Sequence, residues 1–245
     1  MSDLKRLFLA IPINDHFEEL IKLFIGQQEI PKLRWIPAEN WHITVLFLGD
    51  FPVRHIPALI SSLHDFFRTQ QWFSLDFDRF IYKPKQTKPT MIWAKFHQNS
   101  YFNLLCQQTA DHIEKFYSEL SIPFSMSLHS ENTPHITLCR LKNPHLPYPD
   151  FKLKDINPLQ PLLRCDICTL YQSVLTAEGA KYTNLADFKL MQNWFYDTIC
   201  FFLHFICYFQ SVCPGIIVCH NFQCHYHSLM ACNSIPGREN DCLTW

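Results

Sequence analysis

Two short segments of the chain carry the same residues at the same spacing, and these residues can transfer protons. Residues 42–45 read His-Ile-Thr-Val, and residues 135–138 read His-Ile-Thr-Leu. Both segments open apolar runs typical of β-strands, in which residues i and i+2 point to the same face. Each strand therefore presents an imidazole beside a hydroxyl: His42 with Thr44, and His135 with Thr137. A single copy would be an ordinary half-buried strand, whereas two identical His-Ile-Thr copies indicate a shared site.

Two histidines that face one another suit an in-line displacement at phosphorus. Such a reaction needs a base on the attacking side and an acid on the leaving side. The unperturbed imidazole pKa of about 6.5 allows one ring to be neutral and the other protonated near pH 7. Two threonine hydroxyls can hold the non-bridging oxygens without adding charge. This chemistry requires neither a metal ion nor another cofactor.

The elements that must position the motifs follow one another in the same order twice. Apolar patterning predicts strands over residues 7–13, 42–48, 73–82, 90–97, 134–139, 165–175 and 181–190, and helices over about 16–27, 53–69 and 100–119. We expect Asp15 to cap the first helix and Gly179 to lie in the last turn. In each half a strand and a helix precede the His-Ile-Thr strand. This order predicts a duplicated, pseudo-symmetric α+β domain.

The two motifs and their flanking residues resemble the 2H phosphoesterases, and most closely the RNA 2′,3′-cyclic phosphodiesterases historically called 2′-5′ RNA ligases. The resemblance rests on residues 42–49 and 134–140 and extends over about residues 4–190. Further similar stretches are residues 6–11, 33–35, 170–173 and 179–182. The resemblance implies a bilobal α+β fold in which two antiparallel sheets flank a central cleft and the helices lie outside.

The resemblance also implies an activity and a role for each motif residue. The reaction is metal-independent hydrolysis of an RNA-terminal 2′,3′-cyclic phosphate to a 2′-phosphomonoester. His42 is then the proton donor to the departing 3′ oxygen, and His135 is the proton acceptor that activates water. Thr44 and Thr137 bind the phosphate. The spacing alone does not say which histidine is the acid. The implied partners are RNA ends bearing a cyclic phosphate, or related cyclic nucleotides, bound by a monomer.

Other residues near the motifs are candidates for substrate contacts. Arg140 follows the second motif and is a candidate phosphate ligand, although strand parity turns it away from His135 unless the strand bulges. Phe47 fits the family pattern, but the same parity predicts that it packs in the core. Three tryptophans could stack on a base, and packing is the more common role for each: Trp35, Trp41 and Trp93.

Two alternatives to hydrolysis remain open. The same cleft could join RNA ends through a 2′-5′ linkage, which is formally the reverse chemistry. A binding module that holds RNA or nucleotide ends without turnover is the other alternative. The presence of both histidines favours an enzyme, because loss of one histidine would be the simplest mark of a binding module.

Composition separates residues 1–190 from residues 191–245. The 245-residue chain has a net charge of −1, which argues against long duplex nucleic acid as a partner. Residues 1–190 hold 20 of the 21 basic residues and 4 of the 11 cysteines. We predict a phosphoesterase domain of two lobes over 1–190 and a Cys- and aromatic-rich extension over 191–245. The unpaired pattern of the first four cysteines and the lack of a secretory signal predict a reduced, cytoplasmic protein.

The extension has no clear counterpart in the family. Residues 198–219 contain no Asp, Glu, Lys or Arg and could just span a bilayer, although Pro214 and Gly215 weaken that interpretation. The spacing from Cys219 to Cys224 falls outside the usual zinc pattern, so we expect no metal site. Three interpretations stay open: a membrane-associated segment, a packed or partly disordered accessory extension, or a sequence read past or out of frame from an ancestral stop.

Overall fold

The computed structural model describes residues 3–29, 33–84, 88–122, 132–141, 148–151, 162–177 and 179–191. These residues belong to one compact unit, Met1–Trp194. Among them no helix is long and apolar enough to cross a membrane. The interpretations of the extension lie outside the described residues, apart from Met191, and the division at residue 190 stays a prediction.

All three predicted helices are present. Their bounds are α1 Asp15–Gln27, α2 Ile56–Phe67 and α3 Ser100–Glu119, with short 3₁₀ turns η1 Ala38–Asn40 and η2 Val53–His55. The predicted cap of the first helix is wrong by one residue. Asn14 has extended backbone angles, and its side-chain oxygen accepts a hydrogen bond from the backbone N–H of Phe17 at 2.9 Å. Asp15 is therefore the first helical residue, because an N-cap must precede the helical turn whose N–H it satisfies.

The described strands form one antiparallel sheet. Their bounds are β1 Leu4–Pro12, β2 His42–Pro52, β3 Phe73–Lys83, β4 Met91–Phe96, β5 His135–Arg140, β6 Leu162–Cys165, β7 Ile167–Thr176 and β8 Gly179–Lys189. The order across the sheet is β6-β3-β4-β5-β2-β1-β7-β8. The α+β class and the antiparallel pairing are confirmed, whereas the two separate sheets implied by the resemblance are not confirmed, because β5 pairs with β2. Gly179 opens β8 with a φ of +133°, a value that favours glycine.

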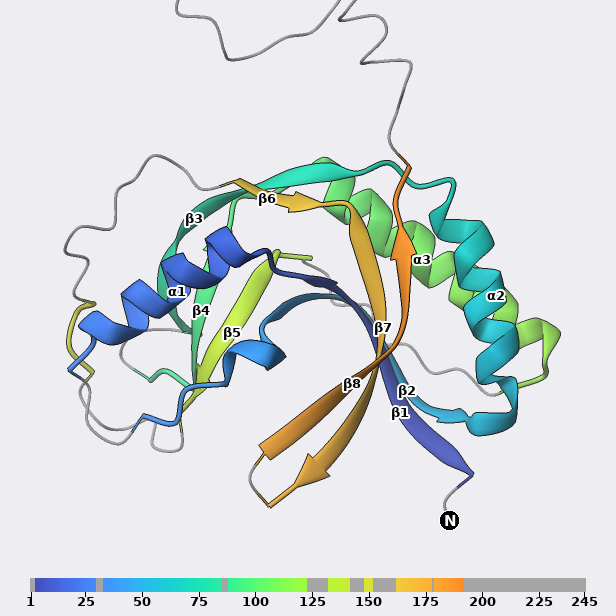
Figure 1. Ribbon diagram of the computed structural model, residues 1–245, viewed down its shortest axis with the longest axis horizontal. Helices are drawn as coiled ribbons and strands as arrows, with labels where there is room; N and C mark the ends of the chain where they lie inside the picture. The colour runs from blue at the N-terminus through green and yellow to red at the C-terminus, as the bar shows by residue number, and fades with distance from the viewer. Residues whose placement is uncertain are drawn as a thin grey trace, which may run out of the picture. The chain divides into compact units, whose positions relative to one another are not determined.

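The strand order is symmetric about the junction of β5 and β2. On one side the order is β5, β4, β3, β6, and on the other it is β2, β1, β7, β8. Each motif strand follows a neighbouring strand through one helix: α1 connects β1 to β2, and α3 connects β4 to β5. The sheet curves strongly between its two halves (Figure 1). The predicted duplication of strand, helix and motif strand is therefore present as a geometric duplication.

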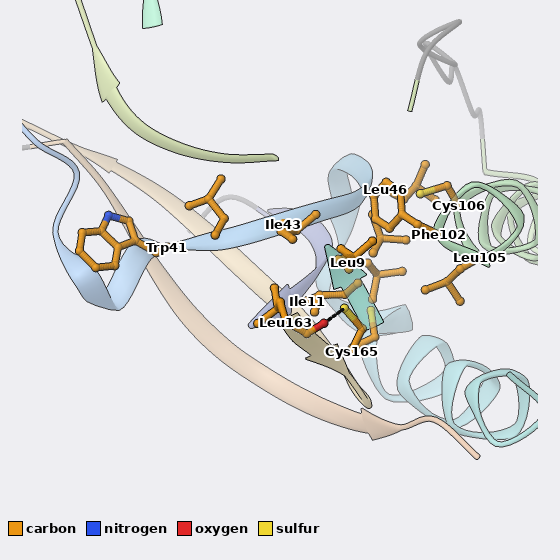
Figure 2. Packing of buried hydrophobic residues seen from close by; sticks show 14 of the residues in the cluster. Leu9, Ile11, Trp41, Ile43, Leu46, Phe102, Leu105, Cys106, Leu163 and Cys165 are labelled. Atoms are coloured by element: carbon orange, nitrogen blue, oxygen red, sulfur yellow. Dashed lines mark hydrogen bonds between the residues drawn. The ribbon is translucent and has the colours of Figure 1, made fainter. Parts of the chain in front are cut away.

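Helices cover the face of the sheet that buries the apolar residues of the motif strands. In one half, the ring of Phe17 on α1 packs on Phe77 and Phe96 with centroids 5.6 and 5.1 Å apart. In the other half, Figure 2 shows Phe102 and Cys106 of α3 beside Leu46 of β2. Both motif strands are thus anchored through one face, which leaves their opposite face for polar side chains.

Candidate active site

The four motif residues emerge from the two central strands on the face that the helices do not cover. Along β2 and β5 the burial alternates in the same way, and Ile43 and Ile136 are 1% and 0% exposed. The histidines and threonines on either side of them are only half-buried. The strands at both positions were predicted correctly, and so was the alternation. The structure therefore brings His42, Thr44, His135 and Thr137 to one face.

The junction between the two motifs is a single residue pair at their midpoints. Ile43 and Ile136 are direct antiparallel partners, and among the described residues they are the one pair that joins β2 to β5. In an antiparallel register, the residue before one isoleucine lies opposite the residue after the other. His42 therefore lies on the side of Thr137, and His135 lies on the side of Thr44. The result is two imidazole–hydroxyl pairs related by an approximate two-fold axis.

Both imidazoles make the same hydrogen bond to the backbone two residues earlier. Nδ1 of His42 lies 2.7 Å from the carbonyl oxygen of Asn40, and Nδ1 of His135 lies 2.8 Å from the carbonyl oxygen of Thr133. A carbonyl oxygen only accepts, so Nδ1 carries the proton in each ring. The neutral rings therefore keep Nε2 unprotonated and available to exchange a proton with a ligand.

Burial makes both histidines harder to protonate in the free protein. Burial, together with the charges of His135 and Arg140, lowers the pKa of His42 from 6.5 to about 4, against the raising effect of its hydrogen bond to the carbonyl of Asn40. The pKa of His135 is lowered by burial too, and Lys83 adds to that effect. Near pH 7 the free site holds two neutral imidazoles.

Bulges bring two further residues onto the face of the histidines. In β5, Leu138 and Cys139 are both buried, and the register with β4 shifts between Ile92 and Trp93. Such a bulge reverses the parity of the following residue. Arg140 is therefore exposed on the side of His135, as the sequence allowed only for a bulged strand.

The corresponding bulge in β2 overturns the prediction for Phe47. Val45 and Leu46 are both buried, and the register with β1 shifts between Leu9 and Ala10. Phe47 is 59% exposed instead of packed in the core. It occupies the same place after His42 that Arg140 occupies after His135. The two halves thus present an aromatic ring at one equivalent position and a guanidinium at the other.

An aromatic cluster surrounds His42. Ring centroids of Phe8, Tyr182 and Tyr171 lie 5.0, 5.3 and 6.3 Å from the imidazole of His42. Phe8 also contacts Phe47, with centroids 5.9 Å apart. Sequence reasoning assigned no role to Phe8, Tyr171 or Tyr182, because their approach to His42 depends on the pairing of β1 with β2 and β7. The only signal was that they lie in stretches resembling the family.

The surroundings of His135 are different. The indole ring of Trp93 stacks on its imidazole with a centroid distance of 3.6 Å and an interplanar angle of 16°. Nζ of Lys83 lies 5.0 Å from the centroid of the Trp93 ring. Of the other tryptophans considered, Trp41 is buried and donates from Nε1 to the carbonyl of Ile36, and Trp35 packs against the core. Among the described residues no group of three His, Cys, Asp or Glu side chains is placed to hold a metal ion.

Comparisons with known proteins define the class to which this fold and site are similar. The LigT like Phosphoesterase family model matches residues 11–93, a range that includes the first motif. These residues, the relatives below and the fold confirm the resemblance to LigT-like phosphoesterases of the 2H family.

Particular relatives carry the name RNA 2′,3′-cyclic phosphodiesterase. One from Thermotoga maritima is 28% identical over 198 residues, which cover 74% of this chain and 94% of that protein. Another from Geobacillus stearothermophilus is 24% identical over 186 residues, which cover 75% of this chain and 57% of that protein. The chain therefore spans just over half the length of the Geobacillus relative.

Solved structures share the fold. TT0787 of Thermus thermophilus superposes with a TM-score of 0.61 at 24% identity, covering 77% of this chain and 99% of that one. E. coli LigT complexed with 3′-AMP gives a TM-score of 0.57 at 22% identity, with the same two coverages.

Proposed function

We propose that this chain is an enzyme that hydrolyses RNA-terminal 2′,3′-cyclic phosphates to 2′-phosphomonoesters without a metal ion. The observation that carries the proposal is the pairing of Ile43 with Ile136, which sets both His-Ile-Thr motifs side by side on one face. The relatives named RNA 2′,3′-cyclic phosphodiesterase support the same activity. The two symmetric halves of the sheet would act as the two lobes, and the phosphate would lie between them.

Proton transfer would run from one histidine to the other across the phosphate. His135 would accept a proton from water, and His42 would donate a proton to the departing 3′ oxygen, as the resemblance implies. The tautomers fit both roles, because each ring offers Nε2 while Nδ1 donates to a carbonyl. In-line attack requires the water and the leaving oxygen on opposite sides of phosphorus, which matches the approximate two-fold relation of the rings.

The low pKa of about 4 for His42 describes the protein before substrate binds. A unit negative charge about 4 Å from the ring contributes about 4 kcal/mol at an effective dielectric constant of 20. That energy corresponds to about 3 pKa units, enough to offset the effect of burial. The anionic cyclic phosphate would thus supply the charge that lets His42 hold a proton. Substrate binding and protonation of the acid are then one coupled event.

Hydroxyls and a guanidinium would hold the phosphate oxygens. Thr44 and Thr137 lie on the same face as the histidines, and both are half-buried. Arg140 reaches this face through the bulge in β5, and its charge already influences His42. A charge-assisted hydrogen bond from Arg140 would stabilise the extra negative charge of the transition state.

The nucleoside would bind on the His42 side. The ribose carries the departing 3′ oxygen, so it must lie near the histidine that protonates this oxygen. The exposed Phe47, whose ring contacts the buried Phe8 beside His42, offers aromatic surface on this side. Base–aromatic stacking is tolerant of sequence and suits single-stranded RNA ends. E. coli LigT complexed with 3′-AMP is consistent with a nucleotide in this fold.

The deciding experiment uses an RNA oligonucleotide that ends in a 2′,3′-cyclic phosphate, incubated with the protein and EDTA. We expect a product with a terminal 2′-phosphate, identified by its resistance to a phosphatase specific for 3′-phosphates and by mass. A 3′-phosphate product would contradict the assignment of the leaving oxygen. A joined product in the presence of a second RNA with a 5′-hydroxyl would indicate ligation, and binding without turnover would indicate a binding module.

A further inference from the structure

Three neighbouring strands line up a cation, an indole and the imidazole of His135. The strands β3, β4 and β5 are adjacent in the sheet. Lys83 is the direct partner of Met91, Trp93 is the partner of Thr137, and Lys95 is the partner of His135. Partners across an antiparallel pair point to the same face. Trp93 therefore stands on the middle strand, with Lys83 on one side and His135 on the other.

The contacts of Trp93 agree with this order. Its ring covers the imidazole of His135 nearly face to face at 3.6 Å. The ammonium of Lys83 lies 5.0 Å from the same indole. Because the imidazole occupies one face of the ring, the ammonium contacts the other. An indole is the aromatic ring best suited to a cation at its face.

The indole N–H has no assigned role in the fold. Trp93 Nε1 is buried and finds no hydrogen-bond acceptor in the part of the chain that the structure describes. A buried indole usually finds a partner for its N–H. The ring is therefore held by its two faces rather than by its edge, which points to a role that depends on stacking.

His42 has no such clamp among the described residues. Its ring neighbours are tilted or edge-on: Phe8 at 42° and Tyr182 at 82°. The backbone bonds of the two histidines are nearly identical, so they do not distinguish the two imidazoles, whereas the neighbouring rings do. The imidazole of His135 is therefore stacked against a parallel ring, whereas the imidazole of His42 is surrounded by rings at an angle to it.

We propose that Trp93, held between the ammonium of Lys83 and the imidazole of His135, is a positioning residue that fixes the plane of His135 and keeps it the proton acceptor of the pair. This inference rests on the proposed hydrolysis of cyclic phosphates. It gives a structural reason for an assignment that otherwise rests on the resemblance alone.

Charge distribution supports the assignment. The charged groups facing His135 are Lys83 on β3, Lys95 on β4, and His42 and Arg140 near the phosphate position. Lys95 is bound to Asp78 at 2.6 Å, so its charge is largely compensated. Lys83 lies behind the indole and away from the phosphate, and it lowers the pKa of His135. The charges of Arg140 and His135 lower the pKa of His42. The negative charge of a bound phosphate would offset this effect. In the proposal, the anionic substrate raises the pKa of His42, while Lys83 opposes protonation of His135.

The test compares variants that keep or remove each part of the clamp. Trp93→Phe keeps a flat ring, whereas Trp93→Leu fills the space without one. Lys83→Met keeps the stem and removes the charge, and Lys115→Met on the exposed surface of α3 is the matched control. The measurements are kcat and KM for the cyclic-phosphate oligonucleotide as a function of pH, and the NMR titration of His135, assigned with His135→Gln.

We expect Trp93→Leu to lower kcat about tenfold or more with KM changed less than about threefold, and Trp93→Phe to retain kcat within about threefold. Lys83→Met should raise the pKa of His135 in the NMR titration, because a nearby cation is lost. The acidic limb of the kcat/KM profile should move to higher pH by about 0.5 unit for the same reason. Lys115→Met should move neither.

Two results would overturn the inference. One is an equal kcat for Trp93→Leu and Trp93→Phe at equal melting temperature. The other is a His135 titration that Lys83→Met leaves in place or moves downward. If the wild-type chain failed to hydrolyse the oligonucleotide, the proposed function would fail, and the NMR titration alone would decide the clamp.

Discussion

The two halves of the site share their chemistry and differ in their surroundings. Each half places His-Ile-Thr on a central strand, buries the isoleucine, and bonds Nδ1 to a carbonyl two residues earlier. His42, however, lies among Phe8, Tyr171 and Tyr182, whereas His135 lies against Trp93. Duplication thus accounts for the presence of two equivalent imidazoles. In the proposed function, the flanking residues would give these two imidazoles unequal roles.

The bulged positions show the same specialisation. Five residues after each histidine the strand returns to the face of the site, with Phe47 in one half and Arg140 in the other. In the proposed function, the ring of Phe47 would contact the nucleoside and the guanidinium of Arg140 would contact the phosphate, so that the two halves divide substrate recognition. Removing either residue should therefore have effects of different kinds.

Removal of either imidazole should have the largest effect on turnover. We expect His42→Ala and His135→Ala each to lower kcat by about 10²-fold or more, the usual contribution of a proton-transfer group. His16→Ala, an exposed histidine on α1, should have no effect. The measurement is single-turnover hydrolysis of the cyclic-phosphate oligonucleotide. Near-normal turnover by either folded variant would rule out the two-histidine mechanism.

The variants Arg140→Met and Phe47→Ala test the two halves separately. Loss of the guanidinium should weaken substrate binding about tenfold or more, the scale of one hydrogen bond to a charged group. Loss of the Phe47 ring should also weaken binding of the oligonucleotide about tenfold, as removal of one stacking contact does. Both side chains are exposed, so the melting temperature should change little.

Inorganic phosphate distinguishes these two variants. Arg140→Met should weaken phosphate binding, and Phe47→Ala should leave it unchanged, because phosphate carries no base. Arg54→Met, on an exposed arginine of η2, controls for the loss of one positive charge. An equal loss of phosphate affinity in the Phe47 variant would contradict the division between the halves.

Most of the fold and the common face of the four motif residues could be predicted from the sequence, whereas the residues that surround the two histidines could not. Period-two and period-3.6 patterns gave all three helices and the motif strands, because these patterns are local. The exposed Phe47 could not be predicted, since the bulge that turns it depends on the register with β1. The stacking of Trp93 on His135 likewise depends on the pairing of β4 with β5. Positions that tertiary pairing decides are the ones that local patterns miss.

The lowered pKa values of the two histidines predict how the stability of the free protein depends on pH. Both histidines have a pKa lowered from the ordinary value, so between about pH 6.5 and 4 the unfolded chain binds more protons than the folded chain. Stability of the free protein should therefore fall as pH falls through this window, by at most about 3 kcal/mol for His42, whose pKa is lowered to about 4.

The same linkage predicts that phosphate binding takes up protons. At pH 6 we expect uptake of up to about one proton, measured by calorimetry in buffers of different ionisation enthalpy, because the anion raises the pKa of His42. His42→Gln should abolish most of this uptake, and His135→Gln should reduce it less. Proton release, or equal effects of the two variants, would contradict the unequal roles of the histidines.

The smallest effect is expected from removing the residues beyond the two halves. Backbone hydrogen bonds tie Met191 to Gln70 and Trp72, so a chain that ends at Trp194 keeps the last described contact of the sheet. Both motifs, Trp93 and the aromatic cluster lie before that point.

We predict that this shortened chain has the same kcat, KM and pH profile within about twofold, because no described contact of the site is lost. A chain that ends at Lys189 is the informative comparison, since it lacks the Met191 bonds, the buried side chain of Leu190 and its backbone bond to Asp166. It should melt at least a few degrees lower, as a loss of about 1 kcal/mol or more does in a domain of this size. A large loss of activity in the chain ending at Trp194, with its melting temperature unchanged, would mean that residues 195–245 contribute to the site and that two half-sites do not complete it.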